Sequence, residues 1–458
     1  MSLISSVLSK ASTSNWIKSG ISVAAGKSVI IVSNFFIFYL LVRVCSENQF
    51  GTWILFTSIY GIFEVANSSF VNNAIIKYYN DFKSEDRGLF VFNALLFTII
   101  LTIVISIILA ISLYFIDHIY HSETLNTLLK YAILLLATSS LINFGNCIEQ
   151  ANMKFKGQLI VSLIKSSIFV SYLLLIYFLK IGFTLNDFLL VQVGSNLIAI
   201  IAVYFITAKY LSFTFGVNRN IIIKITHYGF FTFGIEVIGN ISGNIGQLIA
   251  GALLSPISVG LLNVATRVLN LIEVPLQSIA QILLPKGVVA LNQEGMAGVK
   301  TLYEKSAAVI TAFMFPILIL FFVFSDQIII FIAGEKFIEA SILLKIILVY
   351  SLFKPFGRNA GVMLNAIGKT KINLYMVLIP TAINLLLNYW MIKSLGVIGS
   401  PIATLIATIV GFIFNQYVLY KIANVSFPSI IKLIKSYYIS VFNLARNGLT
   451  KREAINRL

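Results

Sequence analysis

The chain has 458 residues, of which 58% are hydrophobic and only 11% are charged, and its mean hydropathy is +0.94. A soluble globule of this length cannot cover so much apolar surface, which excludes a soluble protein and indicates a polytopic membrane protein. The formal net charge of +16 is explained by membrane orientation and by attraction to anionic lipid. It is therefore no evidence for nucleic-acid binding.

Residues 1–18 lack the compact apolar core of a cleavable signal peptide and predict a short interfacial helix, with disorder as the alternative. A spanning helix needs about 20 predominantly apolar residues. The sequence predicts twelve such helices, at 20–42, 50–73, 89–115, 127–148, 158–179, 187–208, 227–253, 258–284, 302–332, 340–367, 372–393 and 397–420. Uninterrupted apolar runs such as 95–115 exclude a β-barrel, whose strands alternate at period two. The fold class is an all-α membrane protein.

Basic residues indicate the orientation of the chain. With an even number of spans both termini share one side, and Lys10, Lys83, Lys154, Arg219 and Lys371 fall there with the basic tail. The opposite side has little beyond Arg43, Lys130, Lys180, Lys336 and Lys393. Because cytoplasmic loops carry the excess of lysine and arginine, both termini are predicted to be cytoplasmic.

An internal repeat predicts the domain organisation. Shifting the sequence by 209 residues aligns 20–77 with 229–286 and gives nine identities, eight of them not aliphatic. The identities are Gly20/Gly229, Ser33/Ser242, Ser46/Ser255, Gly51/Gly260, Thr57/Thr266, Glu64/Glu273, Val65/Val274, Ser69/Ser278 and Lys77/Lys286. Because six spans separate the copies, the repeat is parallel. We expect an interfacial segment at 1–18, six-helix lobes at 19–209 and 227–422, a linker at 210–226, and a basic cytoplasmic tail at 423–458.

Two stretches of the C-terminal half carry a family resemblance. They are "GEKFIEASILLKIILVYSLFKPFGRNAGVMLNAIGKTKI" at 334–372 and "INLLLNYWMIKSLGVIGSPIATLIAT" at 383–408, together with "LLPKG" at 283–287. The chain resembles the polysaccharide-biosynthesis flippases of the multidrug/oligosaccharidyl-lipid/polysaccharide exporter superfamily. This resemblance implies an alternating-access flippase that moves an undecaprenyl-pyrophosphate-linked oligosaccharide to the outer leaflet of the bacterial inner membrane. The product would serve O-antigen or capsule assembly, with a polymerase and chain-length machinery as further partners.

Charged residues inside the spans are the candidate functional residues, since each costs about 2.5–3.5 kcal/mol at a helix centre. Glu64 and Glu273 occupy repeat-related positions, and either a helix-packing role or proton or cation coupling explains them. Steps of three and four residues place Arg267 and Glu273 on one polar stripe of the eighth helix, and a second stripe precedes it on the seventh. The predicted cavity-lining residues are Asn240, Asn244, Asn263, Asn270 and Gln277.

The 209-residue shift places Lys27 opposite Glu236, so the charge is inverted where the scaffold repeats. We expect an ion pair that closes the cytoplasmic half of the transporter in one state, with Glu236 a third candidate for coupling or gating. The alternative is that Lys27 reaches to the headgroups, because it lies roughly 10 Å inside its helix.

Three further cations, Lys165, Arg267 and Arg358, lie within spans. With Lys27 they are the candidate ligands of the substrate pyrophosphate, since guanidinium binds phosphate oxygens in bidentate fashion and lysine offers a point charge. Lys345 and Lys354 are expected to reach to the headgroups instead. Asn384 and Asn388 are expected to bond between helices.

Enzyme chemistry finds no support in the sequence. No phosphate-binding loop or serine-nucleophile motif is present, and the short "DHIYHSE" segment favours a solvated loop over a metal site. We therefore expect no enzyme activity, cofactor or metal. Two alternatives to the flippase remain: a multidrug or amphiphile exporter of the same superfamily, and a non-transporting scaffold of a polysaccharide-assembly complex.

Overall fold

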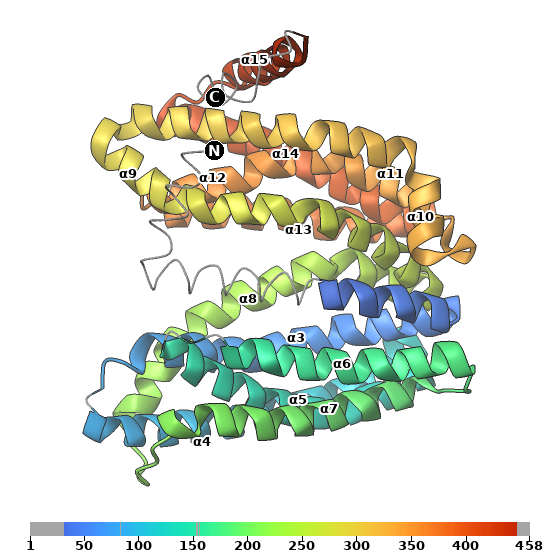
Figure 1. Cartoon of the computed structure of the whole chain (residues 1–458), viewed down its shortest axis with the longest axis vertical. Helices are drawn as coiled ribbons and strands as arrows, with labels where there is room; N and C mark the ends of the chain where they lie inside the picture. The colour runs from blue at the N-terminus through green and yellow to red at the C-terminus, as the bar shows by residue number, and fades with distance from the viewer. Residues whose placement is uncertain (1–31, 83, 153, 155, 447–458) are drawn as a thin grey trace. The chain divides into compact units, whose positions relative to one another are not determined.

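The computed structural model describes residues 32–82, 84–152, 154 and 156–446, and every regular element in this part of the chain is helical (Figure 1). Lys27 and the predicted interfacial segment 1–18 lie outside the described residues. After a helix at Val32–Val44, the first half contains α3 (Glu47–Tyr78), α4 (Ser84–Tyr120), α5 (Glu123–Ala151), α6 (Lys156–Leu179), α7 (Leu185–Thr207), η1 (Ala208–Tyr210) and α8 (Arg219–Leu253). The second half contains α9 (Pro256–Val323), α10 (Ser325–Ala333), η2 (Glu335–Phe337), α11 (Ala340–Ser351), α12 (Lys354–Ala366), α13 (Thr370–Leu395), η3 (Gly396–Ile398), α14 (Gly399–Ala423) and α15 (Phe427–Arg446).

The membrane class predicted from composition is confirmed. The described residues contain eight helices long and apolar enough to cross a membrane, or nine if the bent pair α11 and α12 is one span. Helices are required there because lipid offers no partner for backbone N–H and C=O groups. Each of the twelve predicted spans falls on described helix at least in part, but the count of twelve crossings stays a prediction.

Three predicted spans have different boundaries in the structure. The eighth and ninth are the two arms of α9, an element that is helical through most of the expected loop at 285–301. Its helical geometry breaks at Gly295, whose φ of 62° favours glycine, and Figure 1 shows α9 folding back on itself. The expected single span at 340–367 is bent by 42° between α11 and α12. Pro355, in the first turn of α12, accounts for a new helix start there.

The chain divides into two compact units, Met1–Asn244 and Ile245–Leu458, with the division inside α8. In the N-terminal unit α5 packs against α3, α4 and α7, and α6 packs against α7. A Cβ atom at Gly145 of α5 would overlap the side chain of Val203 on α7, so glycine allows this close packing. The segment after α7 is held on α4 by Asn93, which bonds to Gly216 O and to Asn218 N, each at 2.8 Å.

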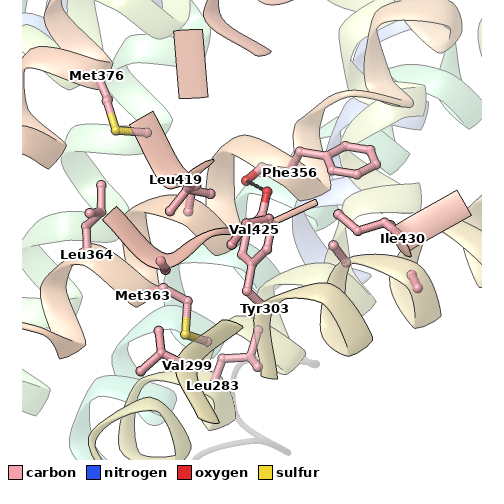
Figure 2. Close-up of a cluster of buried hydrophobic side chains, with 14 residues drawn as sticks. Leu283, Val299, Tyr303, Phe356, Met363, Leu364, Met376, Leu419, Val425 and Ile430 are labelled. Carbon is pink, nitrogen blue, oxygen red and sulfur yellow. Dashed lines mark hydrogen bonds between the residues drawn. The ribbon is translucent and has the colours of Figure 1, made fainter. Parts of the chain in front are cut away.

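In the C-terminal unit α9 packs against α11, α12 and α15, and α13 packs against α14. A buried apolar cluster joins five of these helices, and Figure 2 shows Tyr303 of α9 beside Phe356 of α12 at its centre. The Tyr303 hydroxyl donates to Phe356 O at 3.3 Å, which satisfies a polar group inside the cluster. The predicted division at 210–226 into six-helix lobes remains a proposal.

The internal repeat has a local structural counterpart. Ser46 is the N-cap of α3 and accepts from Gln49 N, while Ser255, 209 residues later, is the N-cap of α9 and accepts from Ser258 N. Capping hydroxyls satisfy backbone donors that a helix start leaves unpaired. The shared serine therefore marks the same helix start in both copies.

Candidate functional site

A polar cavity of about 320 Å³ lies inside the N-terminal unit, among helices that are otherwise apolar. Its walls come from the helix at Val32–Val44 and from α3, α5, α6 and α7. The lining residues are Asn34, Ile37, Phe56, Thr57, Tyr60, Glu64, Leu135, Ser139, Lys165, Ser166, Phe169, Gln192, Ser195 and Asn196. Two predicted site residues, Glu64 and Lys165, are therefore brought into one cavity although they are 101 positions apart.

The polar side chains of the wall form a short hydrogen-bond chain. Tyr60 Oη and Ser139 Oγ are 3.2 Å apart, and Asn196 Nδ2 donates to Ser139 Oγ at 3.3 Å and to Thr138 Oγ1 at 2.9 Å. Asn196 is 2% exposed, and its Oδ1 atom has no hydrogen-bond partner in the described structure. A buried amide oxygen of this kind is costly unless a ligand or water pairs with it. The cavity therefore offers an acceptor as well as its two charges.

Glu64 and Lys165 are opposite charges in one partly buried space. Among the described residues, the ion pairs within 4 Å are Lys345–Asp326 and Lys354–Glu273, so Glu64 and Lys165 share the cavity without a direct pair. Each charge offsets part of the desolvation cost of the other. Either group remains accessible to a third charged species.

Glu273, the repeat partner of Glu64, has a different environment. Its side chain is 9% exposed and forms an ion pair with Lys354, which joins α9 to α12. The expectation that Lys354 reaches to the headgroups is therefore wrong, because the carboxylate on the neighbouring helix provides a closer partner. Lys354 also lines a pocket of about 260 Å³ in the C-terminal unit, with Asn384 and Asn415.

The remaining predicted residues are spread over several environments. Glu236 on α8 is exposed and accepts from Asn73 Nδ2 of α3 at 2.8 Å, while Lys27, its predicted partner, is outside the described residues. Asn244 Nδ2 donates to Asn240 O one turn earlier at 3.0 Å. Asn263 is buried, whereas Asn270, Arg267 and Arg358 are exposed. The side chain of Gln277 lies outside the described part of the structure.

Glu149 is a buried carboxylate that the sequence reasoning missed. It is 3% exposed, and its two oxygens accept from Gly157 N at 2.8 Å and from Gln158 N at 3.1 Å. These are backbone donors at the start of α6, so Glu149 at the end of α5 closes the turn between the helices. Glu149 lies only eight and nine residues before these two backbone donors, and this short spacing could have indicated that it caps the next helix.

Replacing Glu149 with alanine is expected to destabilise the N-terminal unit by about 1–2 kcal/mol, because two backbone donors lose their acceptor. Thermal unfolding of the purified protein in detergent measures this change. Glu123→Ala is the matched control, since Glu123 is exposed in the first turn of α5. Equal melting temperatures for the two variants would contradict the capping role.

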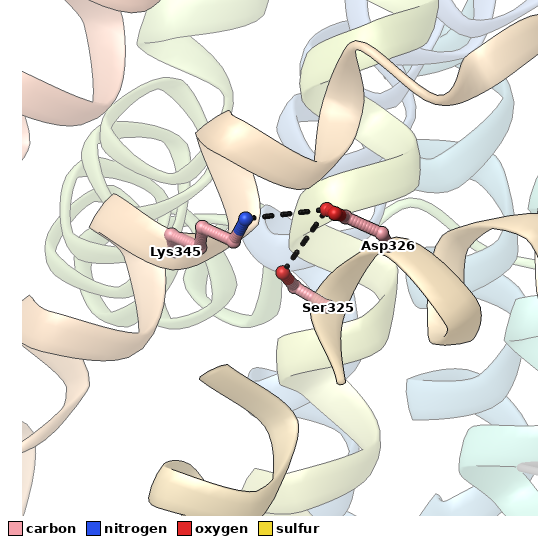
Figure 3. Close-up of polar contacts among 3 residues, drawn as sticks. All are labelled: Ser325, Asp326 and Lys345. Atoms are coloured by element: carbon pink, nitrogen blue, oxygen red, sulfur yellow. Dashed lines mark hydrogen bonds and ion pairs between the residues drawn. The ribbon is translucent and has the colours of Figure 1, made fainter. Parts of the chain in front are cut away.

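Asp326 of α10 forms the second ion pair, beyond the end of the apolar helix Lys286–Val323. Its carboxylate accepts from Lys345 Nζ at 3.2 Å and from Ser325 Oγ at 3.4 Å, and Figure 3 shows both side chains pointing at it. Hydrogen bonds from Ser341 and Lys345 lower the pKa of Asp326. Its side chain is 53% exposed, so the pair adds little to stability.

Comparison with protein families gives one match that covers most of the chain. The profile of a family described as "Polysaccharide biosynthesis protein" matches residues 40–342. A segment of 84 residues is 29% identical to an uncharacterized membrane protein of Methanocaldococcus jannaschii, covering 18% of this chain and 20% of that protein. The chain thus matches about a fifth of the length of this archaeal relative.

Solved structures of membrane transporters share the fold. The inward closed conformation of the lipid II flippase MurJ aligns with a TM-score of 0.73 and 15% identity, over 94% of each chain. An inward-facing multidrug resistance MATE family transporter of the MOP superfamily aligns with a TM-score of 0.68 and 18% identity, over 86% of this chain and 95% of the other. A MOP superfamily transporter from Pyrococcus furiosus aligns with a TM-score of 0.58 and 18% identity, over 86% and 92%. At these identities the similarity shows a common fold.

Proposed function

Because the chain belongs to the polysaccharide biosynthesis protein family, we propose that it is a flippase for a lipid-linked oligosaccharide, working by alternating access. The cargo would be an undecaprenyl-pyrophosphate repeat unit destined for O-antigen or capsule. The protein would reside in the bacterial cytoplasmic membrane with both termini in the cytoplasm. A polymerase and chain-length machinery would use the translocated unit.

The observation that carries this proposal beyond the family is a lysine and a glutamate in one cavity of an apolar helical unit. Charged side chains inside a membrane protein are costly and mark pathways for substrates or ions. The cavity volume of about 320 Å³ is at the lower end of the range for drug-sized ligands. It suits a phosphate group or an ion better than a whole oligosaccharide.

Lys165 and Glu64 would act together on the charge of the cargo. An anionic phosphate that engages the Lys165 ammonium uses the charge that otherwise balances Glu64. Uptake of one proton by Glu64 restores neutrality in the cavity, and its release on the opposite side of the membrane resets the pair. Cargo and proton then cross in the same direction, so the flipping rate depends on the proton gradient without an ATP-binding motif.

The other predicted cations would contribute to the same task at different stages. Arg267 and Arg358 are exposed on α9 and α12, where their guanidinium groups can meet the pyrophosphate as it enters or leaves. Lys27 and Glu236 would pair to close the cytoplasmic half. Asn73, which already donates to Glu236, would keep that carboxylate in place when the pair opens.

Deletion of the gene in its native host tests the proposed function. The deletion strain should lose surface glycan and accumulate the lipid-linked repeat unit in the inner leaflet, and the wild-type gene should restore both. Sensitivity to amphiphilic drugs is measured in parallel. Increased drug sensitivity with normal surface glycan would contradict the flippase and indicate the exporter. Normal glycan and normal drug sensitivity would contradict both.

A further inference from the structure

The helix after the last predicted span, α15, has three different faces. Ile430, Leu433, Ile434 and Tyr437 form the first face, at spacings of three, one and three residues, and they pack against the apolar cluster of the C-terminal unit. Ile430 is fully buried there, as Figure 2 shows. This face fixes how the helix is rotated about its axis, so the other two faces have defined directions.

The second face of α15 is apolar and exposed. Phe427, Ile431 and Tyr438 are 36%, 51% and 40% exposed. At 100° per residue they lie within about 40° of one another round the helix, next to the packed face. An apolar stripe on a surface helix normally faces a core or a lipid phase. One side of the Phe427 ring packs against Phe356 and Phe412, and the Tyr438 hydroxyl bonds to α9, but Ile431 and the exposed parts of the two rings have no such cover within the described unit.

The third face is basic. Lys432 and Lys435 are exposed, with exposed Ile439 between them, and they follow the apolar stripe round the helix on the side away from the packed face. The sequence from 427 to 446 contains no aspartate or glutamate. A helix with a packed face, an apolar stripe and then lysines has the pattern of one that lies in a membrane interface.

Two hydrogen bonds fix the position of α15 along α9. Ser426 N donates to Glu304 Oε1 at 2.8 Å, and the Tyr438 hydroxyl donates to Ala312 O at 2.7 Å. Between these bonds α15 advances twelve residues, or about 18 Å, while α9 advances eight, or about 12 Å. The helix is therefore inclined to α9.

The local sequence places this contact at a membrane boundary. Glu304 and Lys305 are the last charged residues before the uncharged run at 306–323 of α9. The helix α14, which precedes α15, ends at Ala423, four residues before Phe427. Both neighbours thus bring the start of α15 to the level where the apolar part of a span ends.

We propose that α15 is an interfacial helix that binds anionic phospholipid headgroups. Ile431 and the exposed parts of Phe427 and Tyr438 lie among the upper acyl chains, and Lys432 and Lys435 bind the lipid phosphates. The charge favours a lipid surface over a protein partner, since lysines without acidic neighbours complement an anionic leaflet along the whole helix. The contact with α9 and α12 links headgroup binding to the core of the C-terminal unit.

The test uses the full-length protein with an environment-sensitive fluorophore on the single exposed cysteine of an Ile431→Cys variant. Cys45 and Cys147 are buried and stay unlabelled. In vesicles of phosphatidylcholine with phosphatidylglycerol, we expect quenching by spin-labelled lipid and protection from aqueous iodide. Quenching by iodide without quenching by lipid would overturn the proposal.

A titration in detergent separates headgroup binding from simple burial. Phosphatidylglycerol should shift the fluorescence at roughly tenfold lower concentration than phosphatidylcholine. Lys432→Gln/Lys435→Gln, which changes exposed residues only, should abolish this preference. The matched control Lys130→Gln/Lys393→Gln, on exposed lysines predicted to lie on the other side of the membrane, should retain it. Equal response to both lipids in the unsubstituted protein would overturn headgroup binding.

Discussion

Replacing Lys165 with glutamine is expected to reduce glycan export at least tenfold while the amount of protein in the membrane stays the same. A hydrogen bond to a charged group contributes roughly 1.5–3 kcal/mol, and glutamine cannot supply the positive charge that a phosphate needs. Lys165→Arg should retain part of the activity, because the charge remains although its geometry differs. Surface glycan quantified against membrane protein level measures the effect.

The control for Lys165 is its neighbour in the cavity. Lys165→Gln leaves Glu64 without an opposite charge, so a folding defect has to be separated from a transport defect. The double variant Glu64→Gln/Lys165→Gln removes both charges and should be at least as stable as either single variant. It should still fail to export. Export by the double variant at the unsubstituted rate would show that the cavity charges have no role in transport.

Replacing Glu273 with glutamine is expected to lower the melting temperature by several degrees and to leave export per folded molecule largely unchanged. Removing one partner of the Glu273–Lys354 pair leaves the ammonium without its carboxylate. Because Lys354 is 36% exposed, the cost is on the order of 1–3 kcal/mol, below that of a fully buried pair. Thermal unfolding in detergent and export assays on the same preparations measure the two effects.

Asp326→Asn is the matched control, since it breaks the ion pair with Lys345 in which both side chains are accessible to solvent. Its melting temperature should change little. If Glu273→Gln instead unfolds like the unsubstituted protein but loses gradient-dependent export, Glu273 is a coupling carboxylate. The two copies of the repeated glutamate would then share a transport role.

The helices were predictable because a backbone in lipid must pair its own N–H and C=O groups, and a helix does this within one segment. Apolar length alone identifies α4 and α7, each with charged residues only near its ends. The shared N-caps Ser46 and Ser255 are visible as repeat identities in the amino-acid sequence alone. The helical turns on either side of Gly295, within 285–301, were not predictable, because the polar residues there are compatible with helix as well as loop.

Charge partners were harder to predict because they depend on how each helix is rotated and which neighbour it faces. Glu273 and Arg267 were placed on one stripe, yet six residues put them about 120° apart round the helix. Glu273 is buried and Arg267 is exposed accordingly. The actual partner, Lys354, lies 81 residues away on another helix. Hydropathy contains no information about which side chains on different helices come into contact.

The placement of Glu64 and Lys165 in one cavity could not be predicted either. Each was singled out as a charge in an apolar span, but nothing in the spacing of α3 and α6 placed them in one cavity. Glu149 was overlooked because it lies at a helix end, where a carboxylate is expected to be solvated. Burial and the two backbone donors, which only the fold supplies, identify it as a cap.

In the proposed mechanism the cavity with Glu64 and Lys165 moves a lipid-linked oligosaccharide together with a proton. The direct measurement is flipping of a fluorescent lipid-linked oligosaccharide in vesicles that contain only the purified protein, followed by chemical bleaching of the outer leaflet at several pH gradients. We predict gradient-dependent flipping by the unsubstituted protein and loss of the gradient dependence in Glu64→Gln. Flipping that responds equally to the gradient in both proteins would contradict this mechanism.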